Sequence, residues 1–197
     1  MIWMRIFTGI ALAEEAREKV LRELKPFQKT GTPIRWTERR NIHLTLKFIG
    51  EVEESAAVEI AEALQAERPA VAPFRLRLSG FGKFPSGDDL HVFWAGVEES
   101  PELRALFAGV EATLSRLGIA PDARPFQPHL TLGRNKARYN FKGLEALLAE
   151  RRDRFLAEWP VSAFQLFSSR LAPAGPEGPH RGGPVYTVLK EISLVQS

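Results

Sequence analysis

The chain has 197 residues, of which 44% are hydrophobic and 26% are charged, a composition typical of a folded protein with a sizeable core. It contains no cysteine, which excludes disulfides, thiolate catalysis, iron–sulfur clusters and zinc sites built from cysteine. The net charge of +3 and the pI of about 9.4 suit a polyanionic ligand without requiring one.

Hydrophobic periodicity predicts strands and helices along the whole chain. Short apolar runs or period-2 alternation predict strands at 2–12, 42–50, 74–84, 90–97, 126–134, 159–171 and 185–195. Apolar residues at helical spacing predict helices at 13–26, 54–67, 101–117 and 144–151. The segment 173–184, PAGPEGPHRGGP, is rich in proline and glycine and is predicted to be a surface loop.

These elements favour an α+β fold built from two similar halves. Strand, helix, strand and helix follow one another in residues 1–67 and again in residues 91–151, without the strict alternation of a parallel sheet. We expect two pseudo-symmetric lobes, each an antiparallel sheet with helices packed on its outer face, and an active-site cleft between them. The whole chain, 1–197, would form one bilobal domain, with a pseudo-repeat at approximately 1–82 and 83–197.

The tetrapeptide HLTL occurs once in each half, at 43–46 and at 129–132, in a chain with only four histidines. The two copies begin 86 residues apart, close to the offset between the first strands of the halves. Both copies lie in segments predicted to be strands. The repeat therefore indicates a structural duplication, although the halves share little else.

Each HLTL copy should display a histidine beside a hydroxyl group. Side chains alternate along a strand, so His43 and Thr45 are expected on one face while Leu44 and Leu46 enter the core. The second copy is built in the same way. By the same alternation Lys47 is expected to share the face of His43 and Thr45.

Two such pairs suit the opening of a phosphodiester. Histidine titrates near neutral pH, so one imidazole can take a proton from the attacking oxygen while the other protonates the leaving oxygen. The hydroxyls of Thr45 and Thr131 can donate hydrogen bonds to phosphate oxygens, and the planar guanidinium of Arg134 fits phosphate well. No metal or other cofactor is required. Since the site is nearly symmetric, either histidine can be the acid or the base.

The motifs and their surroundings resemble those of the 2H phosphoesterases, specifically the RNA 2',3'-cyclic phosphodiesterases, also called 2'-5' RNA ligases. That family is defined by two His-X-Thr/Ser motifs on strands of two pseudo-symmetric lobes. The resemblance covers nearly the whole chain. It is carried by RIFTGIAL, IRWTERRNIHLTLKFIGEV, FGKFPSGDDLHVFWAGV, PFQPHLTLGRNK, FQLFSSRLAPAGPEG and YTVL.

The resemblance implies an enzyme and assigns roles to particular residues. His43 and His129 would be the general acid and base, with Thr45, Thr131 and Arg134 binding the phosphate. The implied reaction is metal-independent hydrolysis of a 2',3'-cyclic phosphate at an RNA end to a 2'-phosphate. The predicted partner is therefore RNA or an oligonucleotide with such an end.

Two further residues are candidates for substrate binding. Lys47 could contact the substrate or be a solvated charge at the strand end, and Phe48 could stack on a base or be a core aromatic. One departure from the family is the C-terminal Gly-Pro-X-Tyr turn, extended here to GPEGPHRGGPVY. His180 and Arg181 in it could contact RNA, but the simpler expectation is a mobile basic loop. His91 has no His-X-Thr context and is expected to be structural.

Other functions stay open. The same fold could act on 2'-5' linkages, as a ligase or phosphodiesterase, or on small cyclic nucleotides. A non-catalytic RNA-binding module would have an affinity that falls steeply with salt. Zinc hydrolysis is disfavoured, because zinc usually takes three or more protein ligands and neither motif has Asp or Glu at metal-ligand spacing.

The remaining expectations concern location and assembly. No run approaches the ~20 apolar residues of a membrane-spanning helix. The N-terminus, MIWMRIFTGIALAEEAREK, turns acidic at once and shows no convincing cleavage region for a signal peptide. We therefore expect a monomer in the cytoplasm, with no membrane partner.

Overall fold

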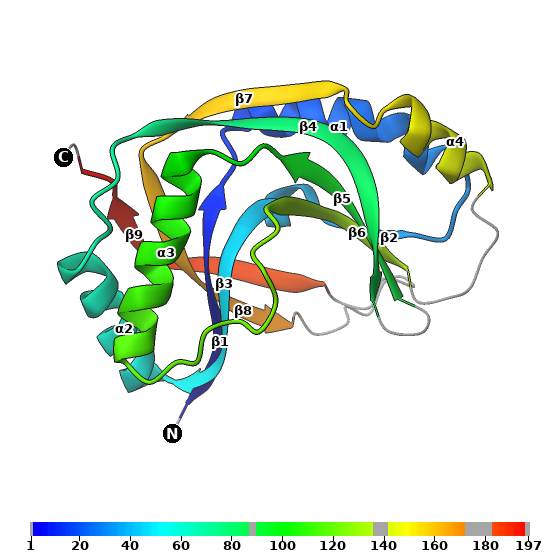
Figure 1. Cartoon of the computed structure of the whole chain (residues 1–197). Helices are drawn as coiled ribbons and strands as arrows, with labels where there is room; N and C mark the ends of the chain where they lie inside the picture. Colours follow the sequence, from blue (N-terminus) through cyan, green and yellow to red (C-terminus); the bar gives the residue numbers. More distant parts are fainter. Residues whose placement is uncertain (1, 87–89, 136–141, 172–182, 196–197) are drawn as a thin grey trace.

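The computed structural model describes residues 2–86, 90–135, 142–171 and 183–195 (Figure 1). Its helices are α1 (Glu14–Gln28), α2 (Glu54–Ala66), α3 (Pro101–Arg116) and α4 (Lys142–Glu150), with a short 3-10 helix η1 (Arg39–Asn41). Its strands are β1 (Trp3–Ala11), β2 (Arg35–Trp36), β3 (His43–Glu53), β4 (Phe74–Ser86), β5 (Leu90–Val97), β6 (His129–Asn135), β7 (Phe155–Val161), β8 (Ala163–Leu171) and β9 (Pro184–Ser193). The four predicted helices are confirmed.

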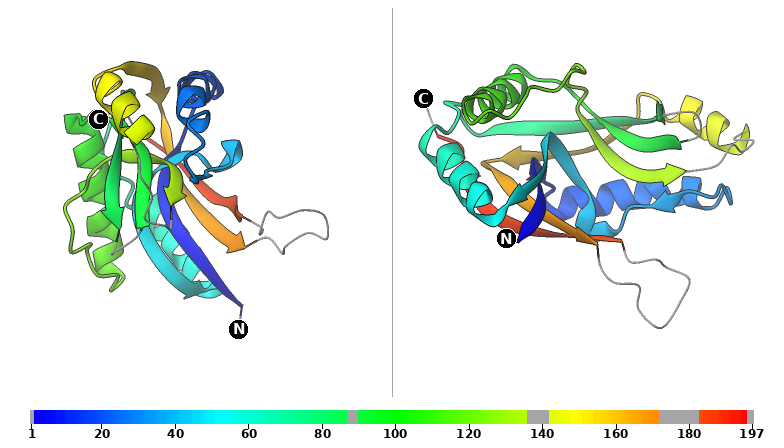
Figure 2. Two further views of the ribbon diagram at one scale, coloured as in Figure 1. Left: turned by 90° about the vertical axis from the view of Figure 1, so that its right-hand side faces the viewer. Right: turned by 90° about the horizontal axis from the view of Figure 1, so that it is seen from below.

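The strands form one curled antiparallel sheet in the order β7-β4-β5-β6-β3-β1-β8-β9, with β2 paired to β6 (Figures 1 and 2). This order consists of two four-stranded halves that meet where β3 touches β6. The two strands pair at a single register position, where Leu44 lies opposite Leu130. The expected α+β class with antiparallel pairing is confirmed.

The sheet divides differently from the two stretches of sequence expected above. β4 lies wholly with β5, β6 and β7, whereas β8 and β9 join β1 and β3. The segment 159–171, predicted as one strand, contains the end of β7 and all of β8, and the chain passes between the halves at Ser162. Apolar residues continue across that point, so periodicity alone did not mark the break. The pseudo-repeat in the sequence stays a prediction.

The helices pack by the apolar faces that the spacing predicted. α1 buries Ala16, Val20, Leu24 and Phe27, which recur every three or four residues. α2 and α3 lie side by side, while α1 packs on β7 and α4 (Figures 1 and 2). Within the ranges given above, no helix is long and apolar enough to cross a membrane.

The N-terminus of α3 is capped by a side chain. Ser100 accepts a hydrogen bond from the backbone N–H of Leu103 at 3.1 Å, and Pro101 occupies the first turn.

The core leucines of both HLTL copies are at most 3% exposed: Leu44, Leu46, Leu130 and Leu132. Each motif strand is therefore anchored through its leucines, which leaves the histidine and threonine on the other face.

Candidate active site

Both HLTL motifs are followed by a β-bulge at the same position. Where β3 pairs with β1, Leu46 is an extra residue that has no partner on β1. Where β6 pairs with β5, Leu132 is an extra residue in the same way. A bulge interrupts the alternation of side chains, so the residues after it point to faces opposite to those that simple counting gives. This feature changes the expectations for the residues that follow each motif.

The bulge in β3 corrects the expectation for Lys47. The Lys47 side chain does not lie beside His43 and Thr45 but is turned into the protein, where it is 2% exposed. Its Nζ is 2.9 Å from Oε1 of Glu111 on α3. The prediction that Lys47 shares the face of His43 is therefore wrong, and its amine is not presented to a substrate.

The same bulge places Phe48 on the histidine face. Phe48 lies opposite Phe7 in the pairing of β3 with β1, and the ring of Phe7 is 4.7 Å from that of His43. Residues opposite one another in an antiparallel pair share a face. Phe48 is 52% exposed, so its alternative assignment as a core aromatic is wrong.

Hydrogen bonds fix the orientation of the His43 ring. Its Nδ1 is 2.7 Å from the backbone oxygen of Asn41, and its Nε2 is 3.0 Å from Oγ1 of Thr45. A carbonyl oxygen only accepts, so Nδ1 carries the hydrogen and donates it to Asn41. In the neutral ring Nε2 then has the free lone pair and accepts from the Thr45 hydroxyl.

Three aromatic side chains enclose His43. The ring centroids of Phe7, Tyr186 and Phe167 lie 4.7, 5.1 and 5.9 Å from its own, with Tyr186 edge-on. Burial, and to a smaller extent the charge of the nearby His129, lowers the pKa of His43 to about 4, although the hydrogen bond to the backbone carbonyl acts in the opposite direction. His43 is therefore neutral at pH 7.

His129 has the same tether and a different surrounding. Its Nδ1 is 2.7 Å from the backbone oxygen of Gln127, so it too donates through Nδ1 and presents Nε2. The ring of Phe84 stands edge-on to it at 5.0 Å and also packs against Trp94 at 5.0 Å. Burial, and to a smaller extent the charge of Arg134, lowers the pKa of His129.

The crossing of β3 and β6 brings the two motifs together. Counting outward from Leu44 opposite Leu130, each histidine falls at the level of the threonine of the other motif. The charge of His129 acts on the pKa of His43, as expected for neighbouring rings. The structure therefore gathers both His-Thr pairs around one point of the sheet.

Arg134 completes this group. It is exposed, and it lies opposite Arg35 of β2 and Val92 of β5. Its charge lowers the pKa of His129, and it opposes the rise that burial causes in the pKa of Tyr186. Within the described ranges its guanidinium makes no hydrogen bond or ion pair, which leaves its donors available to an anion.

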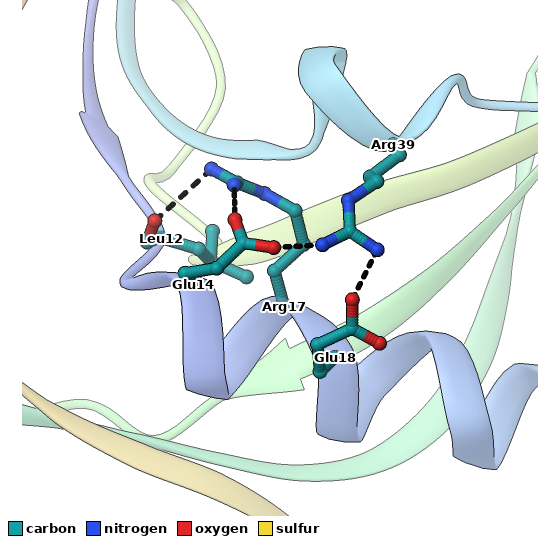
Figure 3. Close-up of polar contacts among 5 residues, drawn as sticks. All are labelled: Leu12, Glu14, Arg17, Glu18 and Arg39. Carbon is teal, nitrogen blue, oxygen red and sulfur yellow. Dashed lines mark hydrogen bonds and ion pairs between the residues drawn. The ribbon is translucent and has the colours of Figure 1, made fainter.

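An ion-pair network holds the segment in front of the first motif (Figure 3). Arg39 of η1 pairs with Glu14 and Glu18 of α1, and the network continues to Arg17 and the backbone oxygen of Leu12. Apart from Arg17, which is 18% exposed, these side chains are about half exposed, so each pair contributes little alone and the network matters mainly as a set. It fixes η1, which ends at Asn41.

Asn41 connects the first motif with the last strand. The residue is 4% exposed, and its Nδ2 donates to the backbone oxygen of Pro184 at 2.6 Å. Its own carbonyl accepts from His43. Asn41 thereby links His43 to the start of β9, the strand that carries Tyr186.

Comparison of the sequence with known proteins identifies its family. The sequence matches the family model described as the 2'-5' RNA ligase superfamily over residues 13–172. The chain belongs to this superfamily. A protein of Aeropyrum pernix named RNA 2',3'-cyclic phosphodiesterase is 38% identical over 169 residues, 85% of this chain and 90% of that one. A protein of the same name from Thermotoga maritima is 35% identical over 191 residues, 97% and 96% of the two chains.

Solved structures show the same architecture. TT0787 of Thermus thermophilus is 33% identical with a TM-score of 0.74, over 97% of this chain and 98% of that one. E. coli LigT complexed with 3'-AMP is 27% identical with a TM-score of 0.73, over 99% and 100%. The curled α+β fold of this superfamily member is thus shared with LigT-type phosphoesterases.

Sequence reasoning missed much of what surrounds the motifs in this superfamily member. The aromatic residues around the histidines, and the two carbonyls that tether them, were not predicted: Phe7, Phe84, Trp94, Phe167, Tyr186, Asn41 and Gln127. Tyr186 had one usable signal, since it lies in the YTVL segment that resembles the family. His180, Arg181 and the side chain of His91 lie outside the described part of the chain. No cluster of three or more His, Asp or Glu able to hold a metal occurs among the residues described.

Proposed function

We propose that this protein hydrolyses the 2',3'-cyclic phosphate at an RNA end and leaves a 2'-phosphate. The observation that carries the proposal is the pair of imidazoles, each tethered at Nδ1 by a backbone carbonyl and each presenting Nε2 on the same face of the sheet. Membership of the 2'-5' RNA ligase superfamily, and relatives named RNA 2',3'-cyclic phosphodiesterase, support it.

In the proposed reaction one histidine removes a proton from water through Nε2, and the water oxygen forms a bond to phosphorus. The bond from phosphorus to the 3'-oxygen of the ribose breaks. The other histidine, protonated, gives its Nε2 proton to that oxygen. The 2'-ester bond stays intact, so the product carries a 2'-phosphate and a free 3'-hydroxyl.

The phosphate would be held by Thr45, Thr131 and Arg134. The Thr45 hydroxyl donates to Nε2 of His43 in the free protein and can turn to a phosphate oxygen when the substrate is bound. A bound anion favours the imidazolium form and counteracts the lowering of both histidine pKa values by burial. Substrate binding thereby supports the one protonated imidazole that the mechanism needs.

We propose that Phe48 stacks on a base of the RNA. Its ring is 52% exposed and lies on the histidine face beside Phe7, where it is available for stacking. Stacking on an aromatic ring recognises a base without reading its sequence, which suits an enzyme for many RNA ends. E. coli LigT, which shares this fold, was solved in complex with 3'-AMP, and this supports a nucleotide ligand for the present chain.

The test uses a short RNA ending in a 2',3'-cyclic phosphate, with EDTA present. Wild type is expected to convert it and leave the phosphate on the 2'-oxygen. His43→Ala and His129→Ala are each expected to lose about 10³-fold in turnover, in the range of general acid–base catalysis, while circular dichroism shows an unchanged fold. The double variant should lose little more than either single variant, because the two groups act together.

Each other outcome has a distinct meaning. A single variant that keeps near wild-type turnover would contradict the two-histidine mechanism. Loss of wild-type activity in EDTA would indicate that a metal is required. Conversion to a 3'-phosphate would mean that the 2'-oxygen, and not the 3'-oxygen, is the leaving group. No conversion by wild type would shift the proposal to another phosphoester or to RNA binding alone.

One alternative substrate has specific support. The superfamily name includes 2'-5' RNA ligation, so the same acid and base could form or cleave a 2'-5' linkage. A panel of 2'-5'-linked dinucleotides, mononucleotide 2',3'-cyclic phosphates and the RNA substrate would rank these possibilities by kcat/KM. The expectations of a monomer and of a cytoplasmic location stay predictions.

A further inference from the structure

Lys47 forms a buried charge cluster directly behind the first motif. Its Nζ lies 2.9 Å from Oε1 of Glu111, 2.9 Å from the backbone oxygen of Ala120 and 3.3 Å from Oδ1 of Asp122. The lysine is 2% exposed and the Glu111 side chain 14%, whereas Asp122 is half exposed. All three acceptors lie on α3 or on the connection that follows it.

This cluster links the two motifs through the backbone. Lys47 lies four residues after His43 on β3, while Ala120 and Asp122 belong to the connection between α3 and β6. That connection leads to Gln127, whose carbonyl accepts the Nδ1 hydrogen of His129. One ammonium group thus attaches the strand of the first histidine to the segment that orients the second.

The other motif has no equivalent cation. The residue at the position of Lys47 is Gly133, where an added Cβ would lie 2.4 Å from Cγ2 of Ile34 and 3.1 Å from Cε3 of Trp36. A side chain cannot be placed there without moving Ile34 and β2. The attachment therefore runs in one direction only, from β3 to the segment before His129.

Burying a lysine in the interior of a protein is energetically unfavourable. Removing an ammonium group from water costs several kcal/mol, and an apolar side chain of similar volume often stabilises a protein at least as well. In some proteins a buried polar or charged group instead fixes one arrangement of the chain. The position of this cluster indicates which arrangement it fixes.

We propose that Lys47 is a positioning residue for His129. By holding the backbone at Ala120 and Asp122, it fixes the path of the chain to Gln127 and so the direction in which Nε2 of His129 points. The catalytic consequence rests on the proposed function, but the structural consequence does not.

The test compares Lys47→Met with Arg151→Met. Arg151 is a matched control, because its Nη1 lies 2.7 Å from Oε2 of Glu23 with the two side chains 17% and 20% exposed, and it joins the end of α4 to α1. Both variants should lower the melting temperature. Lys47→Met alone should lower kcat about 10²-fold, with KM within about threefold, as for a catalytic group displaced by about 1 Å. Lys47→Arg should recover part of the loss.

Two readouts do not depend on activity. Hydrogen exchange of the amides at 119–128 should accelerate in Lys47→Met and stay unchanged in Arg151→Met. In an NMR titration the imidazole of His129 should shift while that of His43 keeps its wild-type titration. These measurements test the positioning role even if wild type fails to cleave a cyclic phosphate, so the two proposals can fail separately.

Further variants separate positioning from stability. Lys47→Met with Glu111→Gln removes the unpaired carboxylate and should recover stability without recovering kcat. Recovery of kcat in that double variant would overturn the proposal. It would also be overturned if kcat in Lys47→Met fell only as far as in Arg151→Met, or if exchange rose evenly through the sheet. Asp122→Asn, at the exposed edge of the cluster, should give a smaller effect of the same kind and keeps the test available if Lys47→Met does not fold.

Discussion

The two halves of the sheet carry the same motif in different surroundings. Both have a histidine tethered at Nδ1 to the carbonyl two residues earlier, and both have a bulge after the threonine. They differ at the fifth residue after the histidine, which is the exposed phenyl ring of Phe48 in one half and the guanidinium of Arg134 in the other. Under the proposed function, the halves supply equal proton-transfer groups and bind different ends of the substrate.

The sharpest test of this division compares Arg134→Met with Phe48→Leu. Arg134→Met should lower kcat/KM by about 10²–10³-fold, because a charged donor aimed at the phosphate is lost. Phe48→Leu should cost about 10-fold, mostly in KM, in the range of one base–aromatic stack. A ribose 2',3'-cyclic phosphate without a base is the control, and it should respond to Arg134→Met but not to Phe48→Leu. Equal losses on both substrates would contradict the division.

The enclosure of His43 should be measurable as a pH dependence of stability. Its pKa of about 4 in the folded protein lies below the ordinary value of 6.5, so the unfolded chain binds the proton more tightly. Stability is therefore complete above about pH 6.5 and declines as pH falls toward 4, by about 2 kcal/mol at pH 5. Urea unfolding of wild type and His43→Gln at pH 7 and pH 5 gives this difference. An equal pH dependence in the two proteins would show that His43 is not desolvated.

The threonines offer the finest comparison of the halves. Thr45→Val and Thr131→Val should each lower kcat about 10-fold, through the loss of one hydrogen bond to the phosphate. Within the described part of the chain, Thr45 alone of the two threonines donates to Nε2 of its own histidine, so Thr45→Val is the variant that should raise the pKa of His43. NMR titration of both variants checks this. A shift of similar size in Thr131→Val would mean that the hydroxyls are interchangeable.

The elements and the motifs could be predicted from the sequence because they depend on local spacing. Helical periodicity located all four helices, and alternation put Leu44 and Leu130 in the core. The bulge could not be predicted, because an extra residue in a ladder depends on the partner strand and not on its own letters. For that reason simple counting placed Lys47 on the wrong face.

The surroundings of the histidines depend on pairing between distant strands. Phe7, Phe167 and Tyr186 come from β1, β8 and β9 and meet around His43 only because β1 lies between β3 and β8. No local sequence pattern predicts contacts between residues on such distant strands. For the same reason the break at Ser162 could not be predicted. There a continuous apolar segment leaves one half of the sheet and enters the other.

The carbonyl tethers have one further consequence. Because Nδ1 of each ring donates to a carbonyl, only Nε2 of each imidazole is available to a substrate, and in the proposed mechanism a turnover moves a proton onto one ring and off the other. At the end of the proposed cycle, the ring that began neutral is protonated and the ring that began protonated is neutral. The rings then have the protonation states that the reverse reaction requires, in which a ribose hydroxyl attacks the phosphate in place of water. Under the proposed function, one pair of rings would therefore be able to catalyse both the opening and the formation of such an ester.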